Sequence, residues 1–466
     1  MSFNSFEFAL FLPIVFIIYW ALKEKLNIQN LFIVGVSYLF YGWWDWRFLI
    51  LIFISSLSSY LTALGMQNNN PGNSRFWLIF NIILNLGILC VFKYFNFFGD
   101  NLLRLFQLFG IQIDWITVDI LLPIGISFYT FQAISYSVDV YKRKINATSN
   151  IIAFLAYIAF FPQLVAGPIE KASNLMPQFL RKRNFDYYMA VTGMRQILWG
   201  LVKKIVIADS CAIYVDRIFN SPDYYSSSTL VLGLILFSFQ AYGDFSGYSD
   251  IAIGCGKILG IKLTPNFKYP YFSRNFGEYW RHWHMSLMSW FKDYVYIPLG
   301  GSRKGIARKI LNIIIVFLLS GIWHGANWNF VIWGLFNGIL LSFFILINQP
   351  RPSGIAVLKD IPAITGTYII TLFALIIFRN NTLESAWHYF TGIFTQSFFE
   401  IPSGLTPVPY IAIFMFIEWL GRRNEFAIEN IPVKSRIVRW CFYWVLLIAI
   451  AFTNNVESQQ FIYFQF

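Results

Sequence analysis

The chain contains one long apolar run after another, and most approach the length that crosses a lipid bilayer. Residues 310–347 hold no Asp, Glu, Lys or Arg, and a helix needs about 20 apolar residues to cross the roughly 30 Å hydrocarbon layer. Hydrophobic residues make up 57% of the 466 residues and charged residues 12%, against about 25% charged in an ordinary globular protein. This pattern excludes a disordered chain or a secreted disulfide scaffold. It predicts an all-α, polytopic integral membrane protein.

The chain is strongly basic, with a formal net charge of +12 from 35 Lys and Arg against 23 Asp and Glu. Such an excess is compatible with nucleic-acid binding, but in a membrane protein it more often reflects cytoplasmic loops rich in Lys and Arg. The basic clusters lie between the apolar runs, at 142–144, 181–183, 203–204, 308–309 and 422–423. We therefore interpret them as topology signals and expect no nucleic-acid partner.

The first apolar run, residues 6–22, has the features of a membrane span rather than of a cleavable signal peptide. No basic segment precedes it, and no small-residue cleavage site follows it. Lys23 and Lys25 come after the run, which places its N-terminus outside the cytoplasm. The next spans are predicted at 29–45, 47–66, 76–94 and 118–140, and their alternation agrees with a cytoplasmic position of the cluster at 142–144.

Beyond residue 150 the runs become less regular. Residues 151–168 are too short to span and are predicted to be re-entrant, which requires protein or water around the irregular backbone. Polar helices are expected at 189–208 and 229–260, whereas 266–306 combine Trp, His, Arg and Asp and cannot all lie in lipid. Three later spans are expected near 361–378, 407–420 and 438–453, for a total of roughly 10–12.

These runs predict a single membrane-embedded domain over residues 1–466. N-terminal helices occupy 1–140, a core that encloses a cavity occupies 150–345, and C-terminal helices occupy 355–466. The sequence shows no internal repeat and no separable soluble domain.

Histidine is scarce and gathers in the polar middle third, since the four residues are His282, His284, His324 and His388. Ionisable groups inside membrane segments are costly and are functional candidates by default. The uncharged run 310–323 covers about 21 Å of helix, less than a full crossing. His324 therefore lies either below the membrane surface, at a break formed by Gly321 and Gly325, or in an interfacial hairpin with tryptophan belt residues. The residues alone leave both open.

Two further histidines lie in the string EYWRHWHMSLMSWFKDYVYIPLGG at 278–301. On a regular helix, His282 shares a polar face with Ser286 and Asp293, and His284 points about 200° away onto an apolar face. The two rings then could not easily serve one site. A hydrogen-bonded structural histidine is the alternative interpretation of His284.

A second polar group lies in the string QAYGDFSGYSD. Helical spacing puts Asp244 and Tyr248 on one stripe and Asp250 on another. The two aspartates need partners in these apolar surroundings, and we expect Arg281 or Lys257 to supply them. Such residues either line a polar tunnel or brace the helix bundle, and bracing is the more common role.

Several common catalytic patterns are absent from the sequence, which contains no GxSxG elbow, no glycine-rich phosphate loop and no HExxH string. This argues against a serine hydrolase, an ATPase or a metalloprotease. The four cysteines are far apart: Cys90, Cys211, Cys255 and Cys441. Neither a disulfide framework nor a metal site is expected.

Four long strings occur together in an order typical of one protein family. They are FFPQLVAGPIE (160–170), QAYGDFSGYSDIAIG (240–254), NFKYPYFSRNFGEYWRHWHMSLMSWFKDYVYIPLGGSRKG (266–305) and LSGIWHGANWNFVIWGLFNG (319–338). They resemble the membrane-bound O-acyltransferase family over nearly the whole chain. Within it they are most similar to the alginate O-acetyltransferase membrane subunit and related bacterial polysaccharide O-acetylation proteins.

The resemblance implies a helical bundle with re-entrant segments around a tunnel across the bacterial cytoplasmic (inner) membrane. It implies that His324, in the string WHG, is the principal catalytic residue and that His284 is the second catalytic position. His282 stands where relatives often have arginine, so no function is carried over to it. We further predict substrate contacts from Asp244, Tyr248, Arg281, Trp323 and Asn327.

The implied reaction is acyl transfer, most simply O-acetylation. An acceptor hydroxyl is a weak nucleophile, and a neutral imidazole that takes its proton accelerates attack by roughly 10²–10⁴-fold. Histidine suits this task because its unperturbed pKa is about 6.5. His284 either orients His324 or donates to the developing oxyanion or departing thiol.

The expected co-substrate is a cytosolic acyl thioester, acetyl-CoA or an acyl carrier, and no tightly bound cofactor is implied. The acceptor is an exported polysaccharide or cell-wall glycan. Because the sequence has no long soluble insert, the resemblance implies a separate extracytoplasmic glycan acetyltransferase as partner. Two alternatives stay open: D-alanyl transfer to teichoic acid within the same family, and a polysaccharide or acyl transporter without acyl-transfer chemistry. Transporters often contain inverted repeats, which this sequence lacks.

Overall fold

The computed structural model describes residues 1–67, 70–111, 120–165, 167–350, 352–398, 400–431, 433–453 and 461–462. Within these residues the chain is helical and contains no strand, which confirms the predicted all-α class. The chain packs as two compact units. The first comprises Met1–Phe185, Leu259–Leu263 and Gly325–Asn327, and the second comprises Asp186–Ile258, Thr264–His324 and Trp328–Phe466. The single domain of 1–466 stays a prediction.

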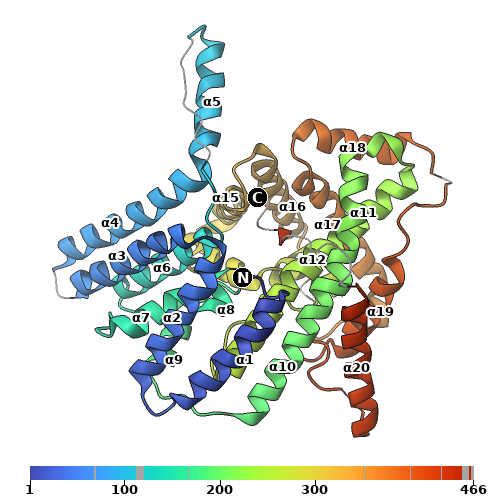
Figure 1. Cartoon of the computed structure of the whole chain (residues 1–466). Coiled ribbons are helices and arrows are strands. Elements are labelled where there is room, and N and C mark those ends of the chain that lie inside the picture. The colour runs from blue at the N-terminus through green and yellow to red at the C-terminus, as the bar shows by residue number, and fades with distance from the viewer. Residues whose placement is uncertain are drawn as a thin grey trace. The chain divides into compact units, whose positions relative to one another are not determined.

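The first unit is helical (Figure 1), and its helices between residues 6 and 89 lie near the predicted spans, whereas the helix at 95–108 was not predicted and the helix of the predicted span 118–140 begins at Ile126. The helices of this unit are α1 (Phe6–Ala21), α2 (Leu26–Asp45), α3 (Leu49–Gln67), α4 (Pro71–Leu89), α5 (Phe95–Leu108), α6 (Ile126–Tyr141), α7 (Ile151–Ala159), α8 (Phe161–Leu164) and α9 (Ala172–Phe179), with the short turns η1 (Trp46–Phe48) and η2 (Cys90–Tyr94). Residues 118–119 of the predicted span at 118–140, and residue 166 of the predicted re-entrant stretch, lie outside the described residues.

Polar side chains join α3, α4 and α6 inside this apolar unit. The Oγ of Ser55 donates to the Oδ1 of Asn85 at 2.5 Å. Asn81 donates through Nδ2 to the Oγ of Ser59 at 3.0 Å and accepts at Oδ1 from Ser137, also at 3.0 Å. Because lipid tails are as apolar as the side chains, the hydrophobic effect does not drive helices together inside a membrane. Interhelical hydrogen bonds of this kind help to hold them together instead.

The second unit contains most of the predicted core of 150–345 together with the C-terminal helices, whereas residues 150–185 of that core belong to the first unit. Its helices are α10 (Tyr187–Leu201), α11 (Ser210–Asn220), α12 (Ser227–Ile258), α13 (Phe276–His282), α14 (Met285–Phe291), α15 (Gly305–His324), α16 (Trp328–Leu346), α17 (Ile361–Arg379), α18 (Leu383–Thr395), α19 (Val408–Gly421) and α20 (Arg436–Thr453). Short helical segments connect them: η3 (Val202–Asp209), η4 (Pro222–Tyr224), η5 (Pro270–Phe272), η6 (Lys292–Tyr296) and η7 (Leu358–Asp360).

Glycines bring α10 and α12 into close contact. A Cβ at Gly200 would lie 2.6 Å from the carbonyl oxygen of Gly247, and a Cβ at Gly247 would lie 2.7 Å from that of Gly200. Gly193 and Gly254 form the same reciprocal pair, at 2.7 and 2.6 Å. The absence of side chains at these positions lets the two backbones approach, as small residues do in membrane helix pairs.

Buried ion pairs tie α12 to η3. Lys204 Nζ lies 2.8 Å from both Asp209 Oδ1 and Asp244 Oδ1, and Lys203 Nζ lies 2.8 Å from Asp250 Oδ2. Both lysines are less than a tenth exposed. A charge in apolar surroundings needs such a partner, and these contacts fix the polar middle of α12.

Seven helical stretches of the described chain are long and apolar enough to cross a bilayer. They are Leu26–Gln67, Pro71–Leu108, Ser227–Ile258, Gly305–His324, Trp328–Leu346, Leu358–Arg379 and Arg436–Thr453. The first two are 42 and 38 residues long, more than the roughly 20 that one crossing needs, and α1 and α19 are shorter apolar helices. The chain is a multi-pass membrane protein, and the total of 10–12 spans stays a prediction.

Candidate active site

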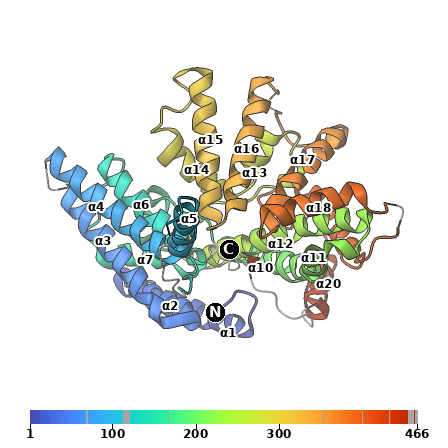
Figure 2. The ribbon, with the colours of Figure 1, turned by 90° about the horizontal axis from the view of Figure 1, so that it is seen from above.

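His324 is the last residue of α15, and glycines determine where this helix end lies. A Cβ at Gly321 would collide with the carbonyl oxygen of Phe330, and a Cβ at Gly334 would collide with that of Phe317. Because both positions lack a side chain, α15 and α16 run side by side in close contact (Figure 2). The helix ends at His324, next to Gly325 as predicted, whereas Gly321 lies inside the helix and not at a break. The close packing puts the imidazole of His324 against α16.

Three aromatic rings surround the imidazole of His324. Its centroid lies 4.9 Å from that of Trp323, 5.0 Å from that of Trp333 and 5.3 Å from that of Phe378, with interplanar angles of 72°, 87° and 82°. His324 is only 5% exposed. Edge-to-face contacts of this kind fix the orientation of a ring. The ring of His324 is therefore enclosed by protein, and its depth in the membrane stays a prediction.

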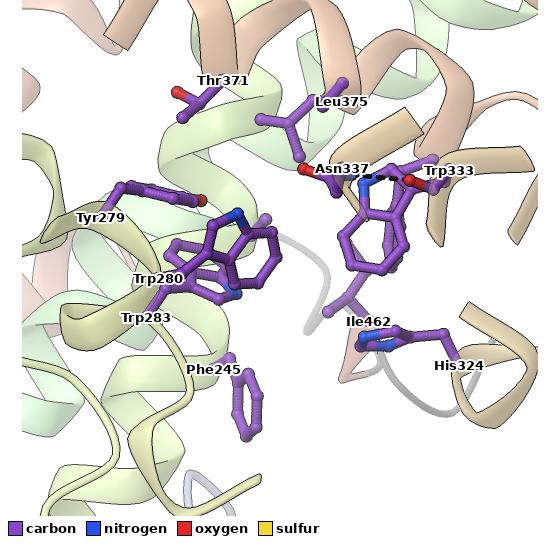
Figure 3. Close-up of a pocket in the computed structure, with 13 residues that line it drawn as sticks. Phe245, Tyr279, Trp280, Trp283, His324, Trp333, Asn337, Thr371, Leu375 and Ile462 are labelled. Carbon is purple, nitrogen blue, oxygen red and sulfur yellow. Dashed lines mark hydrogen bonds between the residues drawn. The ribbon is translucent and has the colours of Figure 1, made fainter. Parts of the chain in front are cut away.

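His324 lines a narrow cavity with a volume of about 30 Å³. Figure 3 shows its imidazole below the indole of Trp333 and next to Ile462. The wall is mostly apolar and aromatic, with side chains from α12, α13, α15, α16 and α17. A polar group on this wall, Asn337, donates through Nδ2 to the carbonyl oxygen of Trp333 at 2.7 Å. A cavity of this size holds one or two waters or a similarly small group.

His284 lies where the helix is broken, so the regular helix assumed for 278–301 is wrong. α13 ends at His282 and α14 begins at Met285. His284 itself has a φ of +44°, in the left-handed region, which side-chain-bearing residues rarely adopt. This break turns His284 inward, where it is 1% exposed.

Hydrogen bonds hold the His284 ring in one orientation. Its Nδ1 lies 3.1 Å from Asn266 Oδ1, which also accepts from Ser286 Oγ at 2.6 Å, while Asn266 Nδ2 donates to Ser249 Oγ at 3.0 Å. Since Asn266 Oδ1 is an acceptor, Nδ1 of His284 carries the proton and Nε2 is the basic nitrogen. His284 lies outside the seven candidate spans, and burial lowers its pKa to about 3. The imidazole is therefore neutral.

Trp323 lies between the two histidines. Its ring centroid is 5.8 Å from that of His284 and 4.9 Å from that of His324. His284 is not among the residues that line the small cavity. The structure thus brings both predicted catalytic residues and the predicted substrate contact Trp323 into one aromatic cluster, and only His324 of these three reaches the cavity.

Asp244 and Tyr248 support the site from α12 without lining the cavity. Asp244 pairs with Lys204 at 2.8 Å and accepts at Oδ2 from the backbone N–H of Ile462 at 2.6 Å. The ring of Tyr248 packs on Phe461 with centroids 4.4 Å apart. Asp244 therefore braces the bundle and positions Ile462, which does line the cavity.

The expected partners of the α12 aspartates are wrong. Asp244 and Asp250 pair with Lys204 and Lys203, whereas Lys257 pairs with Glu425 at 3.1 Å. The sequence analysis interpreted Lys203 and Lys204 as a topology signal, whereas both are buried and reach α12 from the π-helical segment η3.

Arg281 lies on a second and much larger cavity of about 640 Å³. Lys292 and Lys309 line the same cavity, and no Asp or Glu is among its described lining residues. Apolar side chains of α16, including Leu341 and Phe344, complete the wall. The cavity is thus both basic and apolar, which suits an elongated molecule with anionic groups.

Two residues of the site were not predicted as functional. Trp280 on α13 lines both cavities, and Asn337 on α16 lines the small one. A signal existed for Asn337, since an amide in an otherwise apolar membrane helix needs a partner. No sequence signal distinguished Trp280 from the other aromatic residues nearby. Asn327, predicted as a substrate contact, lies half-buried in the turn between α15 and α16.

No group of three or more His, Cys, Asp or Glu side chains placed to hold a metal ion occurs in the described part of the chain. The chemistry of the small cavity is that of an imidazole among aromatic rings. Such a site can accept a proton from a small substrate in surroundings that exclude bulk water.

Comparison with known proteins shows the family to which the chain belongs. The family model for membrane-bound O-acyltransferases matches residues 82–377. A probable alginate O-acetylase of Pseudomonas aeruginosa is 34% identical over 445 residues, which cover 93% of this chain and 83% of that protein. A peptidoglycan O-acetyltransferase of Helicobacter pylori is 36% identical, and the match covers 84% of this chain and 80% of that protein. A teichoic acid D-alanyltransferase of Bacillus subtilis is 28% identical, and the match covers 47% of this chain and 58% of that protein.

These matches confirm the resemblance and the prediction that the chain is an enzyme of the O-acetyltransferase type. The matched region contains α12, both histidines of the aromatic cluster and the walls of both cavities up to residue 377. The chain belongs to the membrane-bound O-acyltransferase family.

Proposed function

We propose that this protein transfers an acetyl group from a thioester donor toward an exported polysaccharide or cell-wall glycan, with His324 as general base. The observation that carries this proposal is the position of His324: buried at a helix break, on the wall of a cavity that fits only a small group. The relatives named as alginate O-acetylase and peptidoglycan O-acetyltransferase support the acetyl group and the glycan acceptor.

In the proposed reaction the imidazole of His324 takes the proton of the acceptor hydroxyl as its oxygen attacks the thioester carbonyl. The new C–O bond forms, the C–S bond breaks, and the proton passes from the imidazolium to the departing sulfur. The products are an ester and a thiol, so no proton is gained or lost overall. Proton transfer of this kind contributes roughly 10²–10⁴-fold to the rate.

The small cavity favours acetyl over D-alanyl transfer. A D-alanyl thioester carries an ammonium group, and burial of a charge requires a partner. The lining residues of the small cavity in the described chain include no Asp or Glu. Its apolar wall suits a methyl group instead. The likeness to a teichoic acid D-alanyltransferase nevertheless makes D-alanyl transfer the second candidate.

The large cavity is the proposed binding site of the donor. Arg281, Lys292 and Lys309 supply positive charge for the phosphates of acetyl-CoA or of an acyl carrier's prosthetic arm. Lys309 and His324 stand fifteen residues apart on α15, about 22 Å at roughly 1.5 Å per residue. A donor that binds there needs a long arm between its phosphates and its thioester, which both candidate donors have.

The membrane orientation agrees with a cytosolic donor. The segment before and into α15 contains Arg303, Lys304, Arg308 and Lys309, and short loops rich in Lys and Arg lie on the cytoplasmic side. The proposed location is therefore the bacterial inner membrane. A separate extracytoplasmic acetyltransferase would then complete delivery to the glycan.

The proposal is tested by the composition of the surface glycan in cells that carry His324→Ala. Acetate released by mild base is measured per mass of glycan, and mass spectrometry identifies the transferred group. The matched control is His388→Ala, which removes an exposed histidine paired with Asp223 at 2.6 Å, a contact worth little stability.

We expect His324→Ala to remove acetate from the glycan at normal protein abundance, and His388→Ala to leave it unchanged. Released D-alanine instead of acetate would favour the second candidate. If His324→Ala stopped glycan export while the remaining glycan kept its acetate, the protein would be a transporter and the proposal would be wrong.

A further inference from the structure

Trp280 lines both cavities. Its side chain belongs to the walls of both the small cavity that contains His324 and the large basic one. The ring packs on Phe317 and Trp333, with centroids 4.8 and 5.8 Å away and interplanar angles of 75° and 70°. Because Trp333 in turn contacts His324, the position of Trp280 relative to the imidazole is set by packed rings.

The indole N–H of Trp280 is a buried donor without a hydrogen-bond partner among the residues that the structure describes. The side chain is 6% exposed. Burial of an unsatisfied donor costs about 1–3 kcal/mol, and most buried polar groups avoid this cost by pairing. A donor of this kind on the wall of a cavity is expected to pair with a molecule that enters the cavity.

Two other donors on the same wall already have acceptors within the protein. Asn337 donates to the carbonyl oxygen of Trp333 at 2.7 Å, and Thr371 donates to the carbonyl oxygen of Tyr368, also at 2.7 Å. Trp280 and His324 both line a cavity of only about 30 Å³, so one small group in it lies within reach of both. An acyl group between them would present its carbonyl oxygen to a donor and its carbonyl carbon to the reacting hydroxyl.

We infer that Trp280 is a further catalytic residue, whose Nε1–H donates a hydrogen bond to the carbonyl oxygen of the acyl thioester. This inference rests on the proposed function. When the hydroxyl oxygen attacks, the carbonyl oxygen becomes an oxyanion and the hydrogen bond strengthens; when the C–S bond breaks, the carbonyl is restored. Such a donor acts mainly on the transition state and typically contributes 10²–10³-fold to the rate.

The placement of Trp280 also assigns the two ends of the donor. The acyl methyl group lies in the small cavity beside His324, and the sulfur and its arm lie in the large cavity with Arg281, Lys292 and Lys309. The scissile C–S bond then lies at the junction that Trp280 forms. This arrangement excludes bulk water from the carbonyl while leaving the thiol an exit.

The test replaces Trp280 by β-(3-benzothienyl)alanine, which keeps the fused ring but has sulfur in place of the N–H. The full chain is produced in cells with its native pathway, and the initial rate of [¹³C]acetate incorporation into surface glycan is normalised to protein abundance. The matched control places the same residue at Trp290, which is also 6% exposed and lines neither cavity. Trp280→Phe serves as a second variant that lacks the N–H.

We expect a fall of roughly 10²-fold for both Trp280 variants and no change for the Trp290 control. A benzothienyl variant at position 280 that retains the wild-type rate would overturn the inference, even if Trp280→Phe were slow, because ring shape rather than the N–H would then matter. Loss of activity in the Trp280 variants together with an active His324→Ala variant would contradict the proposed function instead, so the two failures are distinguishable.

A spectroscopic measurement reports on the hydrogen bond itself. A ketone analogue of acetyl-coenzyme A, in which a methylene replaces the thioester sulfur, is bound to the purified full chain and its carbonyl stretch is recorded by infrared difference spectroscopy. A hydrogen-bond donor lowers the frequency of a carbonyl stretch. We therefore expect a lower frequency in the wild-type complex than in the complex of the benzothienyl variant. An identical band in both proteins, or no shifted band in the wild type, would overturn the inference.

Discussion

The imidazole of His324 meets the indole of Trp333 edge to face, with ring centroids 5.0 Å apart and planes at 87°. This contact joins the end of α15 to α16, and it exists because Gly321 and Gly334 let the two helices approach. The position of the proposed base is thus set by two residues that have no side chain. A change in the helix–helix distance would move the imidazole relative to the cavity.

Gly321→Ala is expected to lower both stability and activity. The added Cβ collides with the backbone of Phe330, so α15 and α16 must separate, at a cost of about 1–3 kcal/mol. A displacement of the imidazole by about 1 Å costs about 10²-fold in rate. Melting temperature in detergent and glycan acetylation check this expectation. Gly366→Ala on α17 is the control, since a Cβ there meets nothing within 4 Å, and equal behaviour of the two variants would contradict the packing argument.

His284 is expected to make stability depend on pH. Burial lowers its pKa to about 3, whereas the unfolded chain has a histidine pKa of about 6.5. Between these values the unfolded state binds one more proton, so this contribution to stability is present above pH 6.5 and is lost as the pH falls toward 3, by at most about 1.4 kcal/mol per pH unit. His284→Gln should flatten the decline in melting temperature between pH 7 and 4.5. An unchanged pH dependence would show that His284 is not buried in the neutral form.

The fully buried ion pairs of Lys204 are expected to stabilise the protein more than the partly exposed pair of Lys257 and Glu425. Lys204→Met leaves Asp209 and Asp244 buried without this cation, and breaking a buried pair costs about 3–5 kcal/mol. Lys257→Met removes a pair with a partner that is 37% exposed, and the expected loss is within about 1 kcal/mol. Denaturation of the two purified variants checks this. Similar losses would mean that the Lys204 cluster does not hold α12.

Lys309→Gln is expected to weaken donor binding without slowing the chemical step. Loss of one hydrogen bond to a charged group costs about 1.5 kcal/mol, roughly a tenfold rise in KM for the donor. The effect should shrink at high salt. Arg303→Gln is the control, because Arg303 lies in the same basic segment but does not line the large cavity. A KM raised equally by both changes would indicate that the basic segment attracts the donor by its overall charge and not through a binding site at Lys309.

The positions of most membrane helices could be predicted from the sequence because a helix that crosses the bilayer needs an apolar run of about 20 residues, which is visible in the sequence. The predicted spans 361–378, 407–420 and 438–453 match α17, α19 and α20 within two residues. The helix α18 (Leu383–Thr395) was missed, since its composition is mixed and its N-terminus depends on a cap by Thr382. Local signals of that kind carry little weight beside long apolar runs.

The site was predictable only in part. His324 could be found from its scarcity and the glycine break, but the orientation of His284 depends on a left-handed residue that breaks the helix between α13 and α14. Periodicity assumes a continuous helix and therefore could not predict this break, although the apolar surroundings predicted for His284 agree with its burial. The lysine partners of Asp244 and Asp250 come from η3, a π-helical segment whose altered spacing no regular pattern anticipates.

The most direct test of the central claim is the initial rate of acetyl transfer to glycan in membrane vesicles that contain the complete pathway, compared between wild type and His324→Gln at equal protein abundance. Glutamine keeps a polar side chain of similar length but cannot act as a base near neutral pH. The account predicts a loss of about 10²–10⁴-fold. A rate for His324→Gln within tenfold of wild type would contradict the role of His324 as the base.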